Sequence, residues 1–115
     1  MIKLGCFYIL SLFIFPRPAQ SVPHDKNKLV VSFISVGTGI DYKAKEKLLL
    51  FMEDFQREHN VSLEASIKNW GREGETDYTF NLKKLSKKQR RAFVKKIEEM
   101  LAGNNRVKIL RSRLN

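Results

Sequence analysis

The sequence predicts a small α+β domain, and three patterns support that prediction. Apolar residues recur at helical spacing in two stretches. Hydrophobic and polar residues alternate in residues 61–70 and 75–82, as is typical of strands with one buried face. Residues 29–36 are rich in β-branched and aromatic side chains, and residues 106–114 are expected to form a closing strand. The predicted order is therefore strand, helix, strand, strand, helix, strand.

The first 21 residues have the pattern of a secretory signal peptide. An apolar run over residues 4–15 follows a positively charged start. Ala19 and Ser21 then place small side chains at the positions needed for cleavage before Val22. A transmembrane helix needs about 20 apolar residues, so this run is short and an uncleaved membrane anchor is the less favoured alternative. We therefore predict an exported protein, either secreted or periplasmic.

The rest of the chain has the size of one domain. Residues 22–28 are expected to be a flexible lead segment, and residues 29–115 are expected to form the domain. The chain is 43% hydrophobic and 30% charged, which is typical of a globular protein rather than a disordered one. The single cysteine, Cys6, lies within the predicted signal peptide, so the exported domain depends on its hydrophobic core without disulfides.

Local signals define the first predicted strand and helix. Residues 29–36 are followed closely by two glycines, which are expected to end the strand. Asp41 is a suitable N-cap for a helix that begins near Tyr42, and Asn60 is expected to end this helix. Its buried stripe is predicted to consist of Ala44, Leu48, Leu49, Phe51, Met52 and Phe55.

The middle of the sequence predicts a β-hairpin with a glycine on each side of its tip. Matching the two strands places Lys68 opposite Asp77 on the exposed face. The same register places Ile67 opposite Tyr78 in the core, whereas a slip of one residue would destroy both matches. Each strand should therefore bury one face, formed by Val61, Leu63, Ala65 and Ile67 on the first and by Thr76, Tyr78, Phe80 and Leu82 on the second.

Trp70, the single tryptophan, is left by this register on the polar face beside the turn. Exposed tryptophan and arginine side chains are frequent anchors in protein interfaces. Trp70 and Arg72 are therefore candidate partner anchors. They define one alternative function, a protein-interaction or inhibitor-like module that uses the open face of the sheet.

The second helix and its ends also have clear signals. Ser86 and Gln89 have the spacing of a capping box at the start of the helix. Gly103 is a suitable stop at its C-terminal end. Its buried stripe is predicted to consist of Phe93, Ile97, Met100 and Leu101.

Joined in this order, the elements predict a ferredoxin-like βαββαβ sandwich, because a hairpin separates two right-handed crossovers. The expected sheet is antiparallel with strand order 4-1-3-2, and both helices cover one face. Charged side chains follow both predicted edge strands, as edge protection requires: Glu64 and Lys68 on one, and Lys108, Arg111 and Arg113 on the other. This fold supports many functions and does not define one.

The excess positive charge is confined to the last third of the chain. Residues 1–82 contain ten Lys or Arg and ten Asp or Glu, whereas residues 83–115 contain twelve basic and two acidic residues. Eight of the basic residues lie within residues 83–96. Helical geometry predicts an outer basic face here, to which the last strand adds two arginines; the candidate anion-binding residues are Lys87, Lys88, Arg91, Lys95, Arg111 and Arg113.

A surface of this kind attracts polyanions. For an exported protein, the expected partners are an acidic protein, an anionic glycan or an anionic membrane surface. The alternative is that the lysine-rich helix face is simply solvated, because no aromatic or amide pattern adds specificity. The sequence leaves the oligomeric state open between a monomer and a weak dimer.

Two activities known for this topology are disfavoured by the residues present. RNA-recognition domains carry basic and aromatic residues on the open face of the third strand, where this chain has Glu75, Asp77, Thr79 and Asn81. Nucleic acid is therefore a disfavoured partner. Acylphosphatases hold an anion between the first strand and first helix, but the arginine-ended loop of that family is missing here. Asp41 would also place its own carboxylate at the helix amides.

Patterns for catalysis, metal binding or cofactor binding are missing from the sequence. His24 and His59 are the two histidines, and no Ser-His-Asp spacing, HExxH motif or cysteine pair is present. We therefore expect a non-catalytic binding domain without a metal or cofactor. A small enzyme of unknown reaction is the third alternative.

Overall fold

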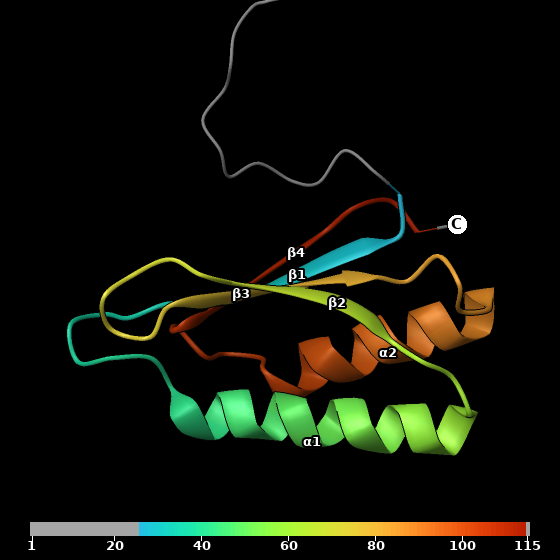
Figure 1. The fold of residues 1–115 in the computed structure, drawn as a ribbon, viewed down its shortest axis with the longest axis horizontal. Helices are drawn as coiled ribbons and strands as arrows, with labels where there is room; N and C mark the ends of the chain where they lie inside the picture. Colours follow the sequence, from blue (N-terminus) through green and yellow to red (C-terminus); the bar gives the residue numbers. More distant parts are fainter. Residues whose placement is uncertain (1–25, 115) are drawn as a thin grey trace, which may run out of the picture.

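A computed structural model describes residues 26–114, which form two layers with both helices on one face of a sheet (Figure 1). The elements are β1 (Lys28–Phe33), α1 (Tyr42–His59), β2 (Glu64–Asn69), β3 (Thr76–Asn81), α2 (Lys87–Met100) and β4 (Val107–Arg111). The sheet order β2-β3-β1-β4 is the predicted order read from the opposite edge, and all neighbours are antiparallel. This arrangement is consistent with the predicted ferredoxin-like layout. The predicted signal peptide and most of the lead segment lie outside the described residues.

β1 and β3 form the centre of the sheet and the middle of the core. Every second residue is buried on both strands: Leu29, Val31 and Phe33 on β1, and Thr76, Tyr78 and Phe80 on β3. The register pairs Leu29 with Phe80 and Val31 with Tyr78, so these buried side chains lie side by side. The buried face predicted for the third strand is confirmed.

Each helix begins at the predicted cap. The Asp41 carboxylate accepts a hydrogen bond from the Ala44 amide at 3.0 Å and starts α1. Asn60 ends that helix in a left-handed conformation with φ of 52°. Ser86 and Gln89 form both hydrogen bonds of a capping box at the start of α2.

An aromatic cluster joins the two helices to the sheet. The fully buried ring of Phe93 on α2 lies 5.4 Å from Phe51 and 5.1 Å from Phe55, both on α1. It lies at the same 5.1 Å distance from Phe80 on β3. Ring centroids at these distances add specific contacts to the burial of apolar area. Val94, which the predicted stripe omitted, is buried as well, whereas Met100 is half-buried.

The β2–β3 hairpin has the predicted register. Lys68 pairs with Asp77, Ile67 pairs with Tyr78, and the Trp70 amide donates to the Glu75 carbonyl at 3.1 Å. The turn returns through Gly74, whose φ is 91°. A β-carbon at Gly74 would lie 2.5 Å from the Tyr42 hydroxyl oxygen, but the exposed Tyr42 side chain can move away, so the backbone conformation is the reason for glycine here.

The buried face predicted for the second strand is confirmed only in its first half. Val61 and Leu63, which precede β2, are half-buried against the core. All six residues of β2 are exposed, and Ile67 retains 58% of its surface although it pairs with the buried Tyr78. Leu49, predicted in the buried stripe of α1, is 40% exposed. The side of α1 that packs into the core carries Ala44, Leu48 and Phe55. Alternation defines the face on which Ile67 lies, but α1 leaves this side chain exposed.

A candidate anion-binding cleft

A cleft of about 380 Å³ lies between α2 and the end of β4. Its lining residues are Arg91, Val94, Lys95, Glu98, Arg111, Ser112, Arg113 and Leu114. Arg91, Lys95, Arg111 and Arg113 are four of the six basic residues predicted from the sequence. The structure thus brings the basic helix and the basic end of the chain together at one site.

Helical spacing determines which α2 side chains line the cleft. Phe93, Val94 and Ile97 are buried and fix the orientation of the helix. Arg91 and Lys95 are one turn apart, so both lie on the same side of α2 next to Val94. Both side chains are exposed, and their charged groups are therefore accessible to a ligand.

Strand register determines the contribution of β4. Arg111 pairs with Leu29, which faces the helix layer, so Arg111 faces this layer too. Arg113 follows two residues later on the same side. Lys108 and Leu110 have the opposite parity and lie on the open face, where both line a different hollow. The predicted basic strand is therefore divided between the two faces of the sheet.

The backbone next to the cleft is held by pairing with β1. The Ser112 amide donates to the Lys28 carbonyl at 2.9 Å, and the Ser112 hydroxyl accepts from the Lys28 amide at 2.7 Å. The Asn27 amide donates to the Arg113 carbonyl at 2.9 Å. Two residues that the sequence assigned to the flexible lead segment, Asn27 and Lys28, thus fix the strand end that presents the arginines.

Among the described residues that line the cleft, Glu98 is the one acidic side chain. Its carboxylate lies 3.7 Å from an Arg111 guanidinium nitrogen, with both side chains about half exposed. An ion pair at this distance and exposure is weak, so it holds Arg111 only loosely. Glu98 offsets one of the four positive charges that line the cleft, and the lining keeps a positive excess. The cleft can therefore bind a phosphate, sulfate or carboxylate group, which arginine contacts through paired hydrogen bonds.

The remaining two predicted anion-binding residues, Lys87 and Lys88, do not line the cleft. Both are exposed in the first turn of α2 and extend the basic surface along the helix. Arg90 has a structural position instead. Its guanidinium donates to the Leu85 carbonyl at 2.6 Å and to the Lys83 carbonyl at 3.3 Å, in the loop that precedes α2.

Trp70 lies on the open face of the sheet and is 50% exposed. Its indole N–H donates to the Asp77 carboxylate at 2.9 Å. A hollow of about 490 Å³ here is lined by Val30, Ser32, Ile34, Trp70, Asp77, Thr79, Lys108 and Leu110. Arg72 is exposed in the β2–β3 turn and does not line this hollow. The apolar residues of β1 and β4 in the hollow were missed as site residues, although β1 is visibly apolar on both faces in the sequence.

The loop before α1 uses its backbone donors internally. The Ser35 hydroxyl oxygen accepts from the amides of Gly37 and Gly39, each at 3.0 Å, and its hydroxyl hydrogen-bonds to the Glu73 carboxylate. Asp41 accepts from the Ala44 amide and from the Asn104 side chain at 2.9 Å. These two hydrogen bonds, the first being the stronger influence, lower the pKa of Asp41. The amides that an acylphosphatase-like anion site would need are therefore occupied.

In the part of the chain from residue 26 to residue 114, no three His, Cys, Asp or Glu side chains gather as a metal site would require. No helix there is both long enough and apolar enough to cross a membrane. No protein-family model matches the chain, and no curated protein or solved structure matches it.

Proposed function

We propose that this protein is a binding domain, rather than an enzyme, and that it holds an anionic group of its partner in the α2–β4 cleft. The observation that supports this proposal is the convergence of Arg91 and Lys95 from a helix with Arg111 and Arg113 from a strand end. One acidic residue, Glu98, accompanies these four basic side chains. An anion placed between helix and strand would be contacted from both walls.

The position of the remaining basic residues favours a partner with repeated anionic groups. Lys87 and Lys88 occupy the first turn of α2, where the helix dipole disfavours positive charge and where no acidic residue is present. Their charge therefore does not serve the stability of the helix. Together with the cleft they form a continuous basic surface, which suits an acidic glycan, an anionic lipid surface or an acidic protein segment.

The test compares three purified polyanions that represent these sources: heparin, vesicles containing phosphatidylserine, and polyglutamate. We expect the double variant Arg91→Glu with Lys95→Glu to bind the physiological class of polyanion about a hundredfold more weakly or worse, because it removes two hydrogen-bonding cations and hydrogen bonds to charged groups contribute about 1.5–3 kcal/mol each. Binding should also weaken as salt is added, because exposed charges are screened beyond about 8–10 Å. The ranking of the three probes identifies the partner class.

A matched control separates the effect of the cleft on binding from the effect of net charge. The double variant Lys43→Glu with Lys47→Glu makes the same charge change, also four residues apart on an exposed helix face, but on α1. It should bind nearly as well as the unmodified protein. Equal losses in both double variants, or no binding to any of the three probes, would contradict the cleft proposal.

The hollow around Trp70 supports a second candidate function, a protein-interaction or inhibitor-like module that uses the open face. Val30, Ile34, Leu110 and Trp70 provide an apolar surface next to the Asp77 carboxylate. Trp70→Ala should then abolish capture of a protein partner without unfolding the domain. Loss of capture in the Arg91 and Lys95 double variant, with the Trp70 variant unaffected, would assign the partner to the cleft instead.

A further inference from the structure

β2 is an edge strand whose outer side is free to pair. Within the described residues it is the last strand of the sheet on its side, next to β3. The Trp70 amide donates to β3, so the even-numbered residues of β2 direct their backbone groups inward. Ala65 and Ile67 therefore direct their N–H and C=O groups away from the sheet. An unpaired edge of this kind is a template for another strand.

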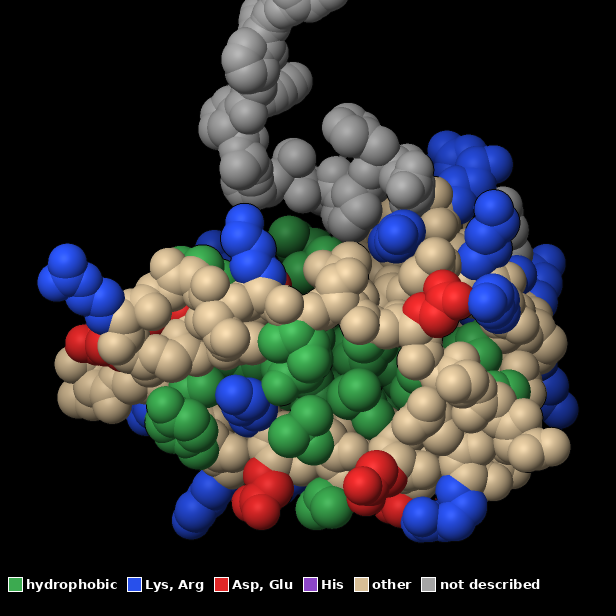
Figure 2. All heavy atoms as spheres, in the orientation of Figure 1, with side chains coloured by type: hydrophobic (Ala, Val, Ile, Leu, Met, Phe, Trp, Pro, Cys, Tyr) green, Lys and Arg blue, Asp and Glu red, His purple; other side chains and the backbone are tan. Residues whose placement is uncertain are grey.

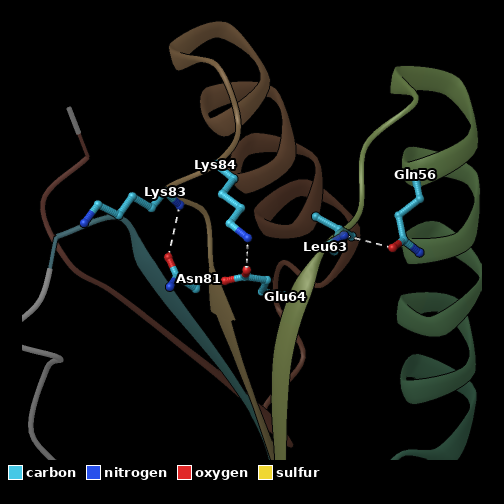
Figure 3. A network of polar contacts seen from close by, with 6 residues as sticks. All are labelled: Gln56, Leu63, Glu64, Asn81, Lys83 and Lys84. Atoms are coloured by element: carbon cyan, nitrogen blue, oxygen red, sulfur yellow. Dashed lines mark hydrogen bonds and ion pairs between the residues drawn. The ribbon is translucent and has the colours of Figure 1, made fainter.

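One end of this edge is already occupied. The Leu63 amide, which precedes β2, donates to the Gln56 side chain on α1 at 2.9 Å, as Figure 3 shows. The outward-facing N–H of Leu63 is therefore already used and is not available to another strand. The outward-facing groups of β2 itself, at Ala65, Ile67 and Asn69, lie beyond it. The available pairing edge is therefore short and its position is defined.

We propose that two copies of this protein pair through β2, antiparallel about a twofold axis at Ser66. In this register Ala65 lies opposite Ile67 of the partner subunit, and each of these pairs exchanges both backbone hydrogen bonds. These backbone hydrogen bonds can form because Ala65 and Ile67 both direct their N–H and C=O groups outward. The two sheets then join into one continuous sheet.

The charged side chains of β2 favour a second copy of the protein as the partner, and they favour this register. Glu64 then lies opposite Lys68 of the partner subunit, and Lys68 lies opposite Glu64 of the partner subunit. These are pairs without mutual backbone hydrogen bonds, in which opposing side chains approach most closely. An interface with twofold symmetry must be complementary to itself, and the β2 sequence Glu-Ala-Ser-Ile-Lys meets that condition.

Existing contacts of Glu64 are compatible with this pairing. The Lys84 ammonium group lies 2.7 Å from one Glu64 carboxylate oxygen, as Figure 3 shows. The hydrogen bond and charge of Lys84 lower the pKa of Glu64, so this residue is ionised at neutral pH. A carboxylate has about four acceptor positions, and it can therefore bind Lys84 and a lysine of the partner subunit together.

Apolar surface lies on the same side of the molecule. Ile67 and Leu49 are 58% and 40% exposed, and Met52 is half-buried. Figure 2 shows hydrophobic side chains gathered between β2 and α1. A strand added to β2 would cover part of this surface, with Ala65 and Ile67 of the partner subunit on the helix side. Apolar burial would thus add to the hydrogen bonds of the edge.

The opposite edge does not offer the same possibility. The charges of β4 and its extension, Lys108, Arg111 and Arg113, are all positive. Two copies meeting there would place like charges together, which is destabilising in a strand pair. Self-pairing is therefore assigned to β2 alone.

The test uses sedimentation velocity on the full protein over a range of concentrations. The unmodified protein should form dimers as concentration rises. Glu64→Lys and Lys68→Glu should each weaken the dimer about tenfold or more, because each replaces two attractive pairs by two repulsive ones. Mixing the two variants should restore association, because both pairs in the mixed dimer are again opposite in charge.

A charge reversal elsewhere provides the control. Lys108→Glu on β4 changes net charge as Lys68→Glu does, and it should leave the dimer intact. Ile67→Pro is a second variant: it removes an outward N–H, which an edge strand tolerates, and should abolish dimers while the thermal unfolding transition persists. A monomer at every attainable concentration would overturn the proposal. So would variants that, alone or mixed, associate as the unmodified protein does, because that result would place the interface elsewhere.

Discussion

The two edges of the sheet differ in how their charges are arranged. β2 carries Glu64 and Lys68, which balance each other, whereas β4 and its extension carry Lys108, Arg111 and Arg113 without an acidic residue. A balanced edge can meet its own copy, and an edge of one sign can meet only a partner of opposite charge. Charged side chains on an edge strand therefore predict two different kinds of partner, depending on whether their charges are balanced or of one sign.

The two edges also differ in how the helices cover them. α2 lies close enough to β4 to form a cleft with polar walls, in which Arg111 faces Glu98. α1 leaves Ile67 on β2 exposed. One edge is thus suited to hold a charged group, and the other combines open hydrogen-bonding groups with apolar surface. Three predictions test whether the two regions are as independent as this difference implies.

The largest effect is expected where the two regions share a core. Phe93→Ala should lower the free energy of unfolding by about 3–5 kcal/mol, because it removes a fully buried ring of α2 that contacts α1 and β3. Urea unfolding would measure this loss. Leu50→Ala is the control; this leucine is 56% exposed on α1, and the change should stay within about 0.5 kcal/mol.

A single transition for all spectroscopic probes would show that both edges unfold together in the Phe93 variant. Separate transitions for the Trp70 signal, which reports on the region beside β2, and for total helix content would instead show that two parts of the molecule unfold independently. In that case the two edges would be independent in folding as well as in binding.

The next effect concerns two carboxylates with lowered pKa values, Asp41 at the start of α1 and Glu64 at the start of β2. Asp41 accepts from the first turn of α1 and from Asn104, which precedes β4, whereas Glu64 contacts Lys84 beside β2. Asp41→Ala should cost about 1 kcal/mol at pH 7, as the loss of an N-cap does. Glu64→Gln should cost less, because its exposed ion pair is screened by solvent.

The pH dependence follows from the direction of the shift. The folded-state pKa of Asp41 lies below the ordinary value of 3.8, so its contribution is present above that value and disappears as pH falls through the folded-state pKa. The stability difference between Asp41→Ala and the unmodified protein should therefore shrink below about pH 4. Urea unfolding at a series of pH values would measure it. A difference that stays constant down to acid pH would contradict the assigned cause.

Local patterns were sufficient to predict most of the fold. Both N-caps, the end of α1, the hairpin register and the order of elements depend on residues close together in sequence. The register of Lys68 with Asp77 and of Ile67 with Tyr78 follows from the alternation together with the glycines on each side of the hairpin tip. The predicted burial of Ile67 failed because alternation defines a face, whereas burial also needs another element to cover the side chain, and α1 leaves Ile67 exposed.

The cleft could be predicted only in part. The sequence identified the basic residues of α2 and of the chain end, but their proximity depends on the pairing of β4 with β1. That pairing also divides the last strand, with Arg111 on the helix side and Lys108 on the open face. Charge counting cannot separate these two residues. The hollow around Trp70 likewise depends on β1, β3 and β4 lying side by side.

The smallest effect is also the sharpest test of the basic surface, because stability and binding should change in opposite directions. Lys87→Glu with Lys88→Glu places two acidic residues in the first turn of α2, where the helix dipole favours negative charge. Each such change is expected to stabilise the fold by about 0.3 kcal/mol at low ionic strength, because both side chains are exposed. Urea unfolding at low and high salt would measure the gain and its screening.

The same variant should bind heparin more weakly than the unmodified protein but more strongly than the Arg91 and Lys95 double variant. Lys87 and Lys88 lie outside the cleft, so they act on the polyanion by attraction over a distance rather than by direct contact. Elution from immobilised heparin along a salt gradient would order the three proteins. If the Lys87 and Lys88 variant elutes earliest, the helix surface binds the polyanion and the cleft does not. If it elutes between the other two, direct contact is assigned to the α2–β4 edge, as the contrast between the two edges requires.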